Sequence, residues 1–205
     1  MRHRPADYER YVPQPGPNRT DETWSSDPEG EFYSFARQYH IAARRLLSQL
    51  EPMQDSLEAK TCSAPVVLAY RKAVVEYLKA TILGEGSNFI VSKVHPLTVF
   101  NSHSLRWLSQ LVRQIVRTVR LEKWFVCEGV TNLRDFRRIM DELDEKADGF
   151  YPDRYPNLLA FSWQMDAILN LLDATAAELA EKWELWARAA AKRMADGENA
   201  TEPAS

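Results

Sequence analysis

Residues 64–83 constrain the fold more than any other part of the chain, because apolar side chains cover most of a helical circumference there. These side chains recur at every third or fourth position, which is the period of an α-helix. Ser63 is a suitable N-cap, Pro65 suits a first turn, and Gly84 and Gly86 stop the pattern. A helix with so little polar surface needs neighbours on several sides, so we expect it at the centre of a bundle.

Four other segments carry an amphipathic pattern of the same period. We expect helices over residues 31–50, 102–123, 131–147 and 158–194. Short connections between amphipathic helices favour antiparallel packing. The sequence therefore predicts an all-α fold, an antiparallel bundle of about five helices. Residues 87–101, rich in β-branched and aromatic side chains, predict an irregular insertion between the second and third helices, either a short hairpin or an ordered loop.

The last predicted helix carries a heptad pattern. The two sets of positions seven residues apart are Leu172, Leu179 and Trp186, and Ala176, Trp183 and Ala190. This is an a/d-type seam over two to three heptads. We expect it to pack on the bundle, and its end to be available for a protein partner.

Both ends of the chain are poor candidates for folding. Residues 1–28 contain prolines at five positions among mainly polar residues, and each proline disfavours helix around it. Residues 195–205 are small and polar. We therefore expect a disordered arm over 1–28, one helical domain over 29–194 and a disordered tail over 195–205.

Composition excludes several classes of protein. The net charge is −3, so no global basic field attracts nucleic acid. Two cysteines suit a reducing compartment, and neither a signal peptide nor a membrane-spanning run is present, so a soluble, cytoplasmic protein is expected. The four histidines lack metal-ligand spacing. Nucleotide-binding loops and hydrolase motifs are also absent, so we expect neither a metal nor another cofactor.

Glu76 and Lys79 are three residues apart on the most apolar predicted helix, so they are neighbours on one face. A charge that is partly buried must be paired, or it costs several kcal/mol. We interpret the two as a structural ion pair that sets helix register. A role for Glu76 in binding a ligand or orienting a base is the alternative.

His103 is expected in the first turn of the third helix, with Arg106 three residues later on the same face. The positive end of the helix disfavours an imidazolium, so His103 would be neutral. A neutral histidine could take the proton of an RNA 2′-hydroxyl while the arginine stabilises the phosphorane. The alternative is that His103 only hydrogen-bonds within the bundle and helps to cap the helix.

A basic stripe follows on the same predicted helix. Its members, at offsets 0, 7, 11 and 14, are Arg106, Arg113, Arg117 and Arg120. A local stripe of this kind can bind a phosphate backbone even on an acidic protein. The alternative is a solvated face whose partners are carboxylates of the fourth helix, such as Asp141, Glu142 and Asp144.

Residues 148–156 combine a helix end, two prolines and three aromatic rings with Asp148, Asp153 and Arg154. Packing of the prolines and rings would hold this segment against the bundle. Arg154 would then need an acidic partner, for which Glu76 and Asp148 are the candidates. One interpretation is that the segment has a structural role only. The other is that it forms a rigid polar loop that lines a binding pocket.

The order of these pieces resembles the HEPN superfamily (higher eukaryotes and prokaryotes nucleotide-binding domain). The first helix, FYSFARQYHIAARRLL, looks like that of the family, and the run from Tyr70 to Lys79 is similar to its YR.A.E..LK second helix. His103-Ser-Leu105 is similar to the HdL opening of the third helix, and residues 148–156 are similar to a D.....RYP segment. The resemblance covers roughly residues 30 to 190.

The resemblance implies an all-α bundle, commonly a homodimer. Active members are metal-independent RNases of toxin–antitoxin, CRISPR or abortive-infection systems, with an arginine and a histidine separated by four to six residues. Here only two residues separate Arg37 from His40, and no arginine lies within range of His95 or His103. The resemblance thus implies a non-catalytic HEPN-like protein that binds RNA, a nucleotide or a partner protein, in a bacterial defence or toxin–antitoxin context. An RNase using His103 and Arg106 across a homodimer, and a structural bundle that docks on a larger complex, are the alternatives.

Overall fold

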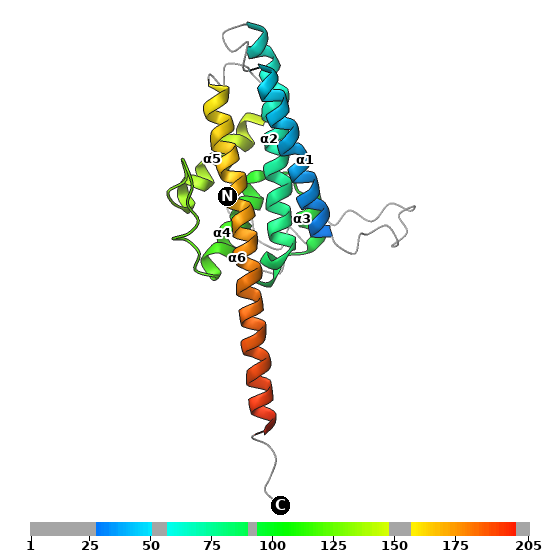
Figure 1. The fold of residues 1–205 in the computed structure, drawn as a ribbon, viewed down its shortest axis with the longest axis vertical. Helices are drawn as coiled ribbons and strands as arrows, with labels where there is room; N and C mark the ends of the chain where they lie inside the picture. Colours follow the sequence, from blue (N-terminus) through cyan, green and yellow to red (C-terminus); the bar gives the residue numbers. More distant parts are fainter. Residues whose placement is uncertain (1–27, 51–56, 90–93, 148–156, 200–205) are drawn as a thin grey trace, which may run out of the picture.

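The structure is a computed structural model and describes residues 28–50, 57–89, 94–147 and 157–199 (Figure 1). Over these ranges it contains six α-helices, one 3-10 helix and no β-strand. In chain order the elements are α1 (Pro28–Leu50), α2 (Leu57–Leu83), η4 (Glu85–Phe89), α3 (Pro96–Asn101), α4 (Leu105–Thr118), α5 (Leu133–Ala147) and α6 (Leu158–Asn199). The predicted all-α helical bundle is confirmed.

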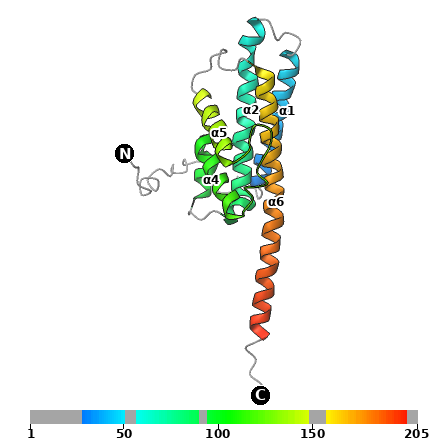
Figure 2. The same cartoon turned by 90° about the vertical axis from the view of Figure 1, so that its left-hand side faces the viewer.

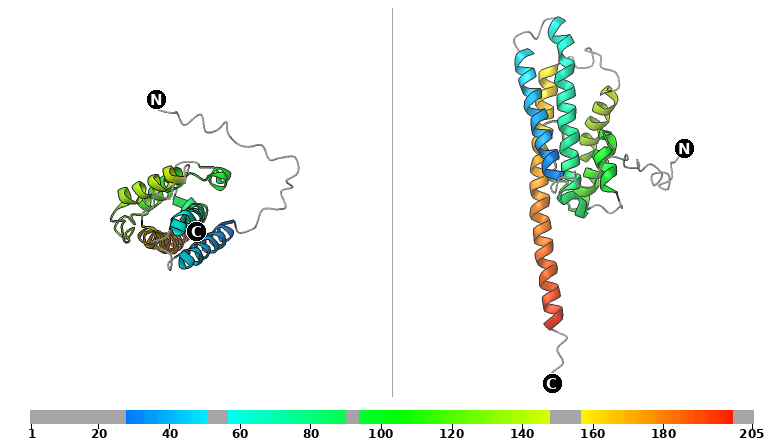
Figure 3. Two further views of the ribbon diagram at one scale, coloured as in Figure 1. Left: turned by 90° about the horizontal axis from the view of Figure 1, so that it is seen from above. Right: turned by 90° about the vertical axis from the view of Figure 1, so that its right-hand side faces the viewer.

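The centre of the bundle is α2, as its apolar circumference predicts. It packs against α1, α3, α4, α6 and η4, and every residue from Ala73 to Ile82 is buried. Viewed from above in Figure 3, the other helices surround it. α1 runs antiparallel to both α2 and α6, and Figure 2 shows α4 and α5 together on the side of α2 away from α1.

The predicted start of α2 was wrong. The helix begins at Leu57, so Ser63 is not its N-cap and Pro65 lies inside it. Pro65 has no N–H, which leaves the carbonyl of residue 61 without its intrahelical donor and usually ends a helix. Packing of α2 along α1 outweighs this local cost, because tertiary contacts stabilise helices more than propensity does.

α4 is shorter than predicted at both ends. The Ser104 hydroxyl accepts from Trp107 N at 3.3 Å, so the cap is Ser104 and not residue 101 or 102. At the other end Arg120 takes a left-handed conformation with φ of 59°, and Leu121 N donates to Val116 O at 2.9 Å. This is the hydrogen-bond pattern of a Schellman stop, here without the usual glycine.

The remaining helix bounds differ from prediction in smaller ways. Asn132 caps α5 by accepting from Arg134 N at 2.8 Å, so α5 begins two residues after Thr131. α6 reaches Asn199, so the predicted tail begins inside a helix. The predicted arm, apart from Pro28, lies outside the described residues.

The insertion between α2 and α4 contains two helices, η4 and α3, separated by residues 90–93, which lie outside the described part. The alternative of a hairpin is not supported, because the segment around Pro96 is helical. His95 Nδ1 accepts from Leu97 N at 3.2 Å and Pro96 occupies the first turn, where its missing N–H costs nothing. None of the described helices combines the length and the apolar composition needed to cross a bilayer.

Candidate functional site

One face of α4, together with one residue of α5, forms a hollow of about 620 Å³ that we call the arginine groove. Its lining residues are Arg106, Gln110, Arg113, Gln114, Arg117 and Thr118 from α4 and Arg137 from α5. They recur every three or four residues, opposite the apolar face of α4 that packs into the core. The predicted basic stripe therefore does line a concavity, with an additional arginine from the next helix.

Two of the four groove arginines are neutralised by carboxylates of α5. Arg106 Nε lies 3.1 Å from Asp141 Oδ1, and its Nη2 lies 3.0 Å from Glu145 Oε1. Arg137 Nε lies 3.3 Å from the other oxygen of Asp141. The contacts of Arg106 and Arg137 therefore fit the alternative interpretation, a solvated face whose partners are carboxylates of α5.

Arg113 and Arg117 differ from this pair. Within the described ranges neither has a carboxylate at ion-pair distance, and Arg113 Nε is buried without a hydrogen-bond acceptor. Burial, reinforced by the charges of Arg117 and Arg137 and partly offset by Asp141, lowers the pKa of Arg113. A buried donor without a partner costs about 1–3 kcal/mol. Arg113 therefore carries its charge with neither a carboxylate nor a hydrogen bond at Nε among the described residues.

Arg120 does not belong to the groove. The sequence pattern places it on the same stripe, but α4 ends at Thr118. Arg120 then adopts its left-handed conformation, which takes it off the helical face. The helical stripe therefore ends at Arg117, and a role for Arg120 in binding stays a prediction.

Asp144 of α5 fixes the start of α4. Its Oδ2 accepts from Ser104 Oγ at 3.0 Å and from Arg106 N at 3.1 Å, and its Oδ1 accepts from Arg71 Nη2 at 3.0 Å. Burial raises the pKa of Asp144, but these hydrogen bonds outweigh it and hold the pKa below its ordinary value. A charged Asp144 thus ties together α2, α4 and α5 at one end of the groove.

His103 and Arg106, predicted as a catalytic pair across a homodimer, have different surroundings within one chain. His103 precedes the Ser104 N-cap, so it lies outside the first turn of α4, while Asp141 and Glu145 hold the Arg106 side chain. The pKa of His103 is lowered, as predicted, but by burial and then by Lys79 and Lys72. His103 is therefore electrostatically coupled to α2.

Glu76 and Lys79 are buried and adjacent, as expected for an ion pair inside the bundle. Glu76 Oε2 lies 3.6 Å from Lys79 Nζ, and its Oε1 lies 3.8 Å from Lys72 Nζ. The Lys79 ammonium is also 5.2 Å from the centre of the Phe32 ring. Burial lowers the pKa of Lys79, and the charge of Glu76 opposes this shift. Asp148 and Arg154, for which a polar loop near Glu76 was predicted, lie outside the described residues.

Sequence reasoning missed a polar cluster that joins three helices. His40 Nε2 of α1 lies 2.6 Å from Asp166 Oδ1 of α6, and the Tyr70 hydroxyl of α2 donates to the same oxygen at 3.0 Å. Burial and the charge of Asp166 raise the pKa of Tyr70 well above its ordinary range. The partners are 126 and 96 residues apart in the chain, so no local spacing could reveal them.

The cluster gives a stability prediction. Asp166→Ala should destabilise the fold by about 1–3 kcal/mol, because it leaves the buried Tyr70 hydroxyl without its acceptor. Asp173→Ala is the control on the same helix, since Asp173 is half exposed and lies 3.8 Å from an exposed Arg37. Urea unfolding measures both. Equal, small losses in the two variants would contradict a stabilising role for the cluster.

Among the residues that the structure describes, no three histidine, cysteine, aspartate or glutamate side chains are placed to hold a metal ion. Comparison with protein-family models, with curated proteins and with solved structures finds no match to this chain. The similarity to the HEPN superfamily therefore stays a prediction.

Proposed function

We propose that this protein binds RNA through the arginine groove and does not cleave it. The observation that carries the proposal is the pair Arg113 and Arg117, two guanidinium groups in a hollow without a carboxylate partner among the described residues. A guanidinium is always charged and presents several N–H donors, which suits the oxygens of a phosphodiester.

The length of the groove favours a strand over a single nucleotide. From Arg106 to Thr118 the lining runs over about 18 Å at 1.5 Å per residue. A nucleic-acid strand carries one phosphate per nucleotide, so a groove of this length contacts more than one phosphate of the same strand. Gln110 and Gln114 add neutral donors and acceptors between the charges.

The position of His103 favours binding without cleavage. Cleavage by the proposed pair needs the imidazole and the Arg106 guanidinium at one phosphate. Arg106 instead makes two ion pairs with α5, and His103 is coupled to the lysines of α2. A HEPN relationship, a bacterial defence or toxin–antitoxin context and a cytoplasmic location remain proposals that rest on the sequence resemblance and composition.

The experiment is a titration of fluorescently labelled single-stranded RNA, followed by anisotropy at several salt concentrations. We expect the affinity to fall as salt rises, with a slope in log–log form of about −0.7 per phosphate contacted. The RNA should stay intact on a gel, and His103→Ala should bind it as tightly as the natural chain. Salt-insensitive binding, or cleavage that is lost in the His103→Ala variant, would overturn the proposal.

A further inference from the structure

The C-terminal part of α6 leaves the bundle as a single helix (Figures 1 and 3). No residue from Glu181 to Ala189 is buried, and the exposed fractions of Leu185 and Trp186 are 54% and 53%. Its nearest ring contacts are with Phe89 of η4, 6.2 Å from Trp183 and 5.2 Å from Trp186 between ring centres. Beyond these contacts with η4 the described part of the helix is exposed. A helix without tertiary packing is marginal in water, so this projecting end would gain stability from a partner.

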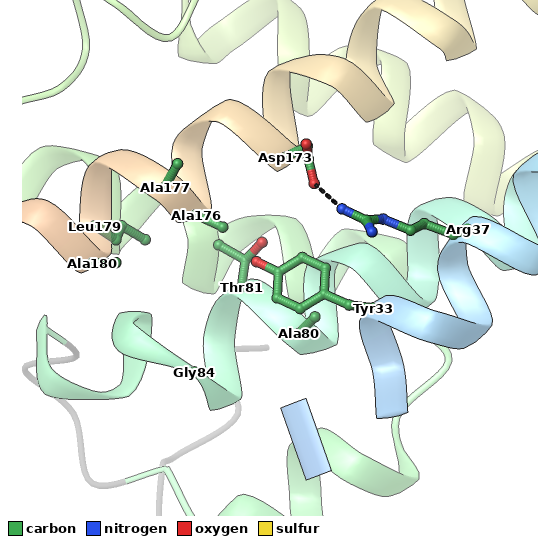
Figure 4. Close-up of a pocket in the computed structure, with 10 residues that line it drawn as sticks. All are labelled: Tyr33, Arg37, Ala80, Thr81, Gly84, Asp173, Ala176, Ala177, Leu179 and Ala180. Atoms are coloured by element: carbon green, nitrogen blue, oxygen red, sulfur yellow. Dashed lines mark ion pairs between the residues drawn. The ribbon is translucent and has the colours of Figure 1, made fainter. Parts of the chain in front are cut away.

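A second hollow, which we call the bundle-end groove, lies beside α6 just before it leaves the bundle. Its volume is about 390 Å³. Figure 4 shows Tyr33 and Arg37 of α1 on one side and Asp173, Ala176 and Ala177 of α6 on the other. The short alanine side chains leave room for another helix to approach α6 closely.

We propose that two copies of this chain associate through antiparallel pairing of α6, so that the end of each α6 lies along the partner's bundle-end groove. The lengths match this arrangement. Asp173, in the groove, lies thirteen positions before Trp186. Asn199, at the end of the helix, lies thirteen positions after Trp186. A two-fold axis near Trp186 therefore brings each helix end alongside the partner's groove.

The face of α6 that borders the groove continues into the projecting segment. Positions 173, 177, 180, 184 and 188 recur with the helical period and share one side. Glu184 and Arg188, which bond to each other at 2.7 Å, therefore lie on the continuation of the groove face. Association through this face is isologous, with the same patch on both copies.

The order of charges selects the antiparallel direction. Glu181 and Glu184 precede Arg188 and Lys192 along the projecting segment. An antiparallel pair centred near Trp186 places the acidic turn of one copy opposite the basic turn of the other. A parallel pair would place Arg188 and Lys192 against the same residues of the partner, and like charges across an interface cost free energy.

Sedimentation velocity over a range of protein concentrations tests the association. We expect a dimer whose dissociation constant rises by about tenfold in Glu184→Arg and in Arg188→Glu, because each change places like charges opposite each other. An equimolar mixture of the two variants should recover the dimer. Glu178→Arg, the same change of charge on another side of α6, should leave it unchanged. A monomer at every concentration, or equal effects of Glu178→Arg and Glu184→Arg, would overturn the proposal.

Cysteine pairs test the direction, in a chain whose Cys62 and Cys127 are replaced by serine. Ala180 and Lys192 are equally far from Trp186 on opposite sides. Mixing Ala180→Cys with Lys192→Cys chains should give a mixed disulfide under mild oxidation, with little disulfide within either population. Disulfides formed mainly between two Ala180→Cys chains would overturn antiparallel pairing. A dimer bound by an unrelated face would give neither product.

Discussion

Replacing Arg113 and Arg117 together by glutamine should weaken RNA binding by at least about a hundredfold. A hydrogen bond to a charged group contributes about 1.5–3 kcal/mol, and 1.4 kcal/mol is a factor of ten in affinity. These are the two groove arginines that lack a carboxylate partner within the described residues, so their full charge is available to phosphate. Anisotropy with the same single-stranded RNA measures the change.

The control for this experiment removes the same charge elsewhere. Arg138 bonds to Glu142 at 3.0 Å, Arg44 lies 4.0 Å from Asp166, and neither lines the groove. Arg138→Gln with Arg44→Gln should leave binding nearly unchanged. The groove variant should also reduce the salt slope by about 1.4, since two phosphate contacts are lost. Equal losses in the two double variants would show that RNA responds only to overall charge.

Replacing Glu76 by alanine should destabilise the fold by about 3–5 kcal/mol, the usual cost of leaving a buried charge without its partner. Glu76 and Lys79 are 6% and 2% exposed, so water cannot replace the lost carboxylate. Thermal and urea unfolding measure the loss. An unchanged melt would contradict the ion pair as a stabilising feature.

The same variant has a defined pH dependence. Burial already lowers the pKa of Lys79 in the folded protein, and loss of Glu76 removes the main charge that opposes this shift. The unfolded state then binds more protons than the folded state on the alkaline side, so stability rises with pH there. We expect the deficit of Glu76→Ala to shrink as the pH approaches the ordinary lysine value of about 10.4. Glu76→Leu with Lys79→Met should recover most of the stability, because an apolar pair of similar volume carries no unpaired charge.

Apolar periodicity predicted most of the fold, because burial against α2 is what selects the helices. Helix ends were harder to predict, since they depend on single residues in uncommon roles. Arg120 ends α4 in a conformation that favours glycine, and Pro65 sits inside a helix that its neighbours stabilise. Neither is recognisable from residue type alone.

The candidate site was predictable only in part, for a similar reason. Spacing along one helix placed Arg106, Arg113 and Arg117 on one face, and the structure adds Arg137 from α5. The packing of α5 against α4 decides which arginines have a carboxylate partner. The spacing of residues within α4 carries no information about that packing. His103 was expected inside the first turn because the predicted cap, residue 101 or 102, lies two or three residues before the observed cap, Ser104.

The most direct measurement of RNA binding in the arginine groove is nuclear magnetic resonance of the arginine side-chain Nε–H groups during titration with single-stranded RNA. Our account predicts that the signals of Arg113 and Arg117 shift first, because among the described residues these two groove arginines have no carboxylate partner. Those of Arg138 and Arg188 should stay in place. Shifts confined to arginines outside the groove, with Arg113 and Arg117 unmoved at saturation, would contradict it.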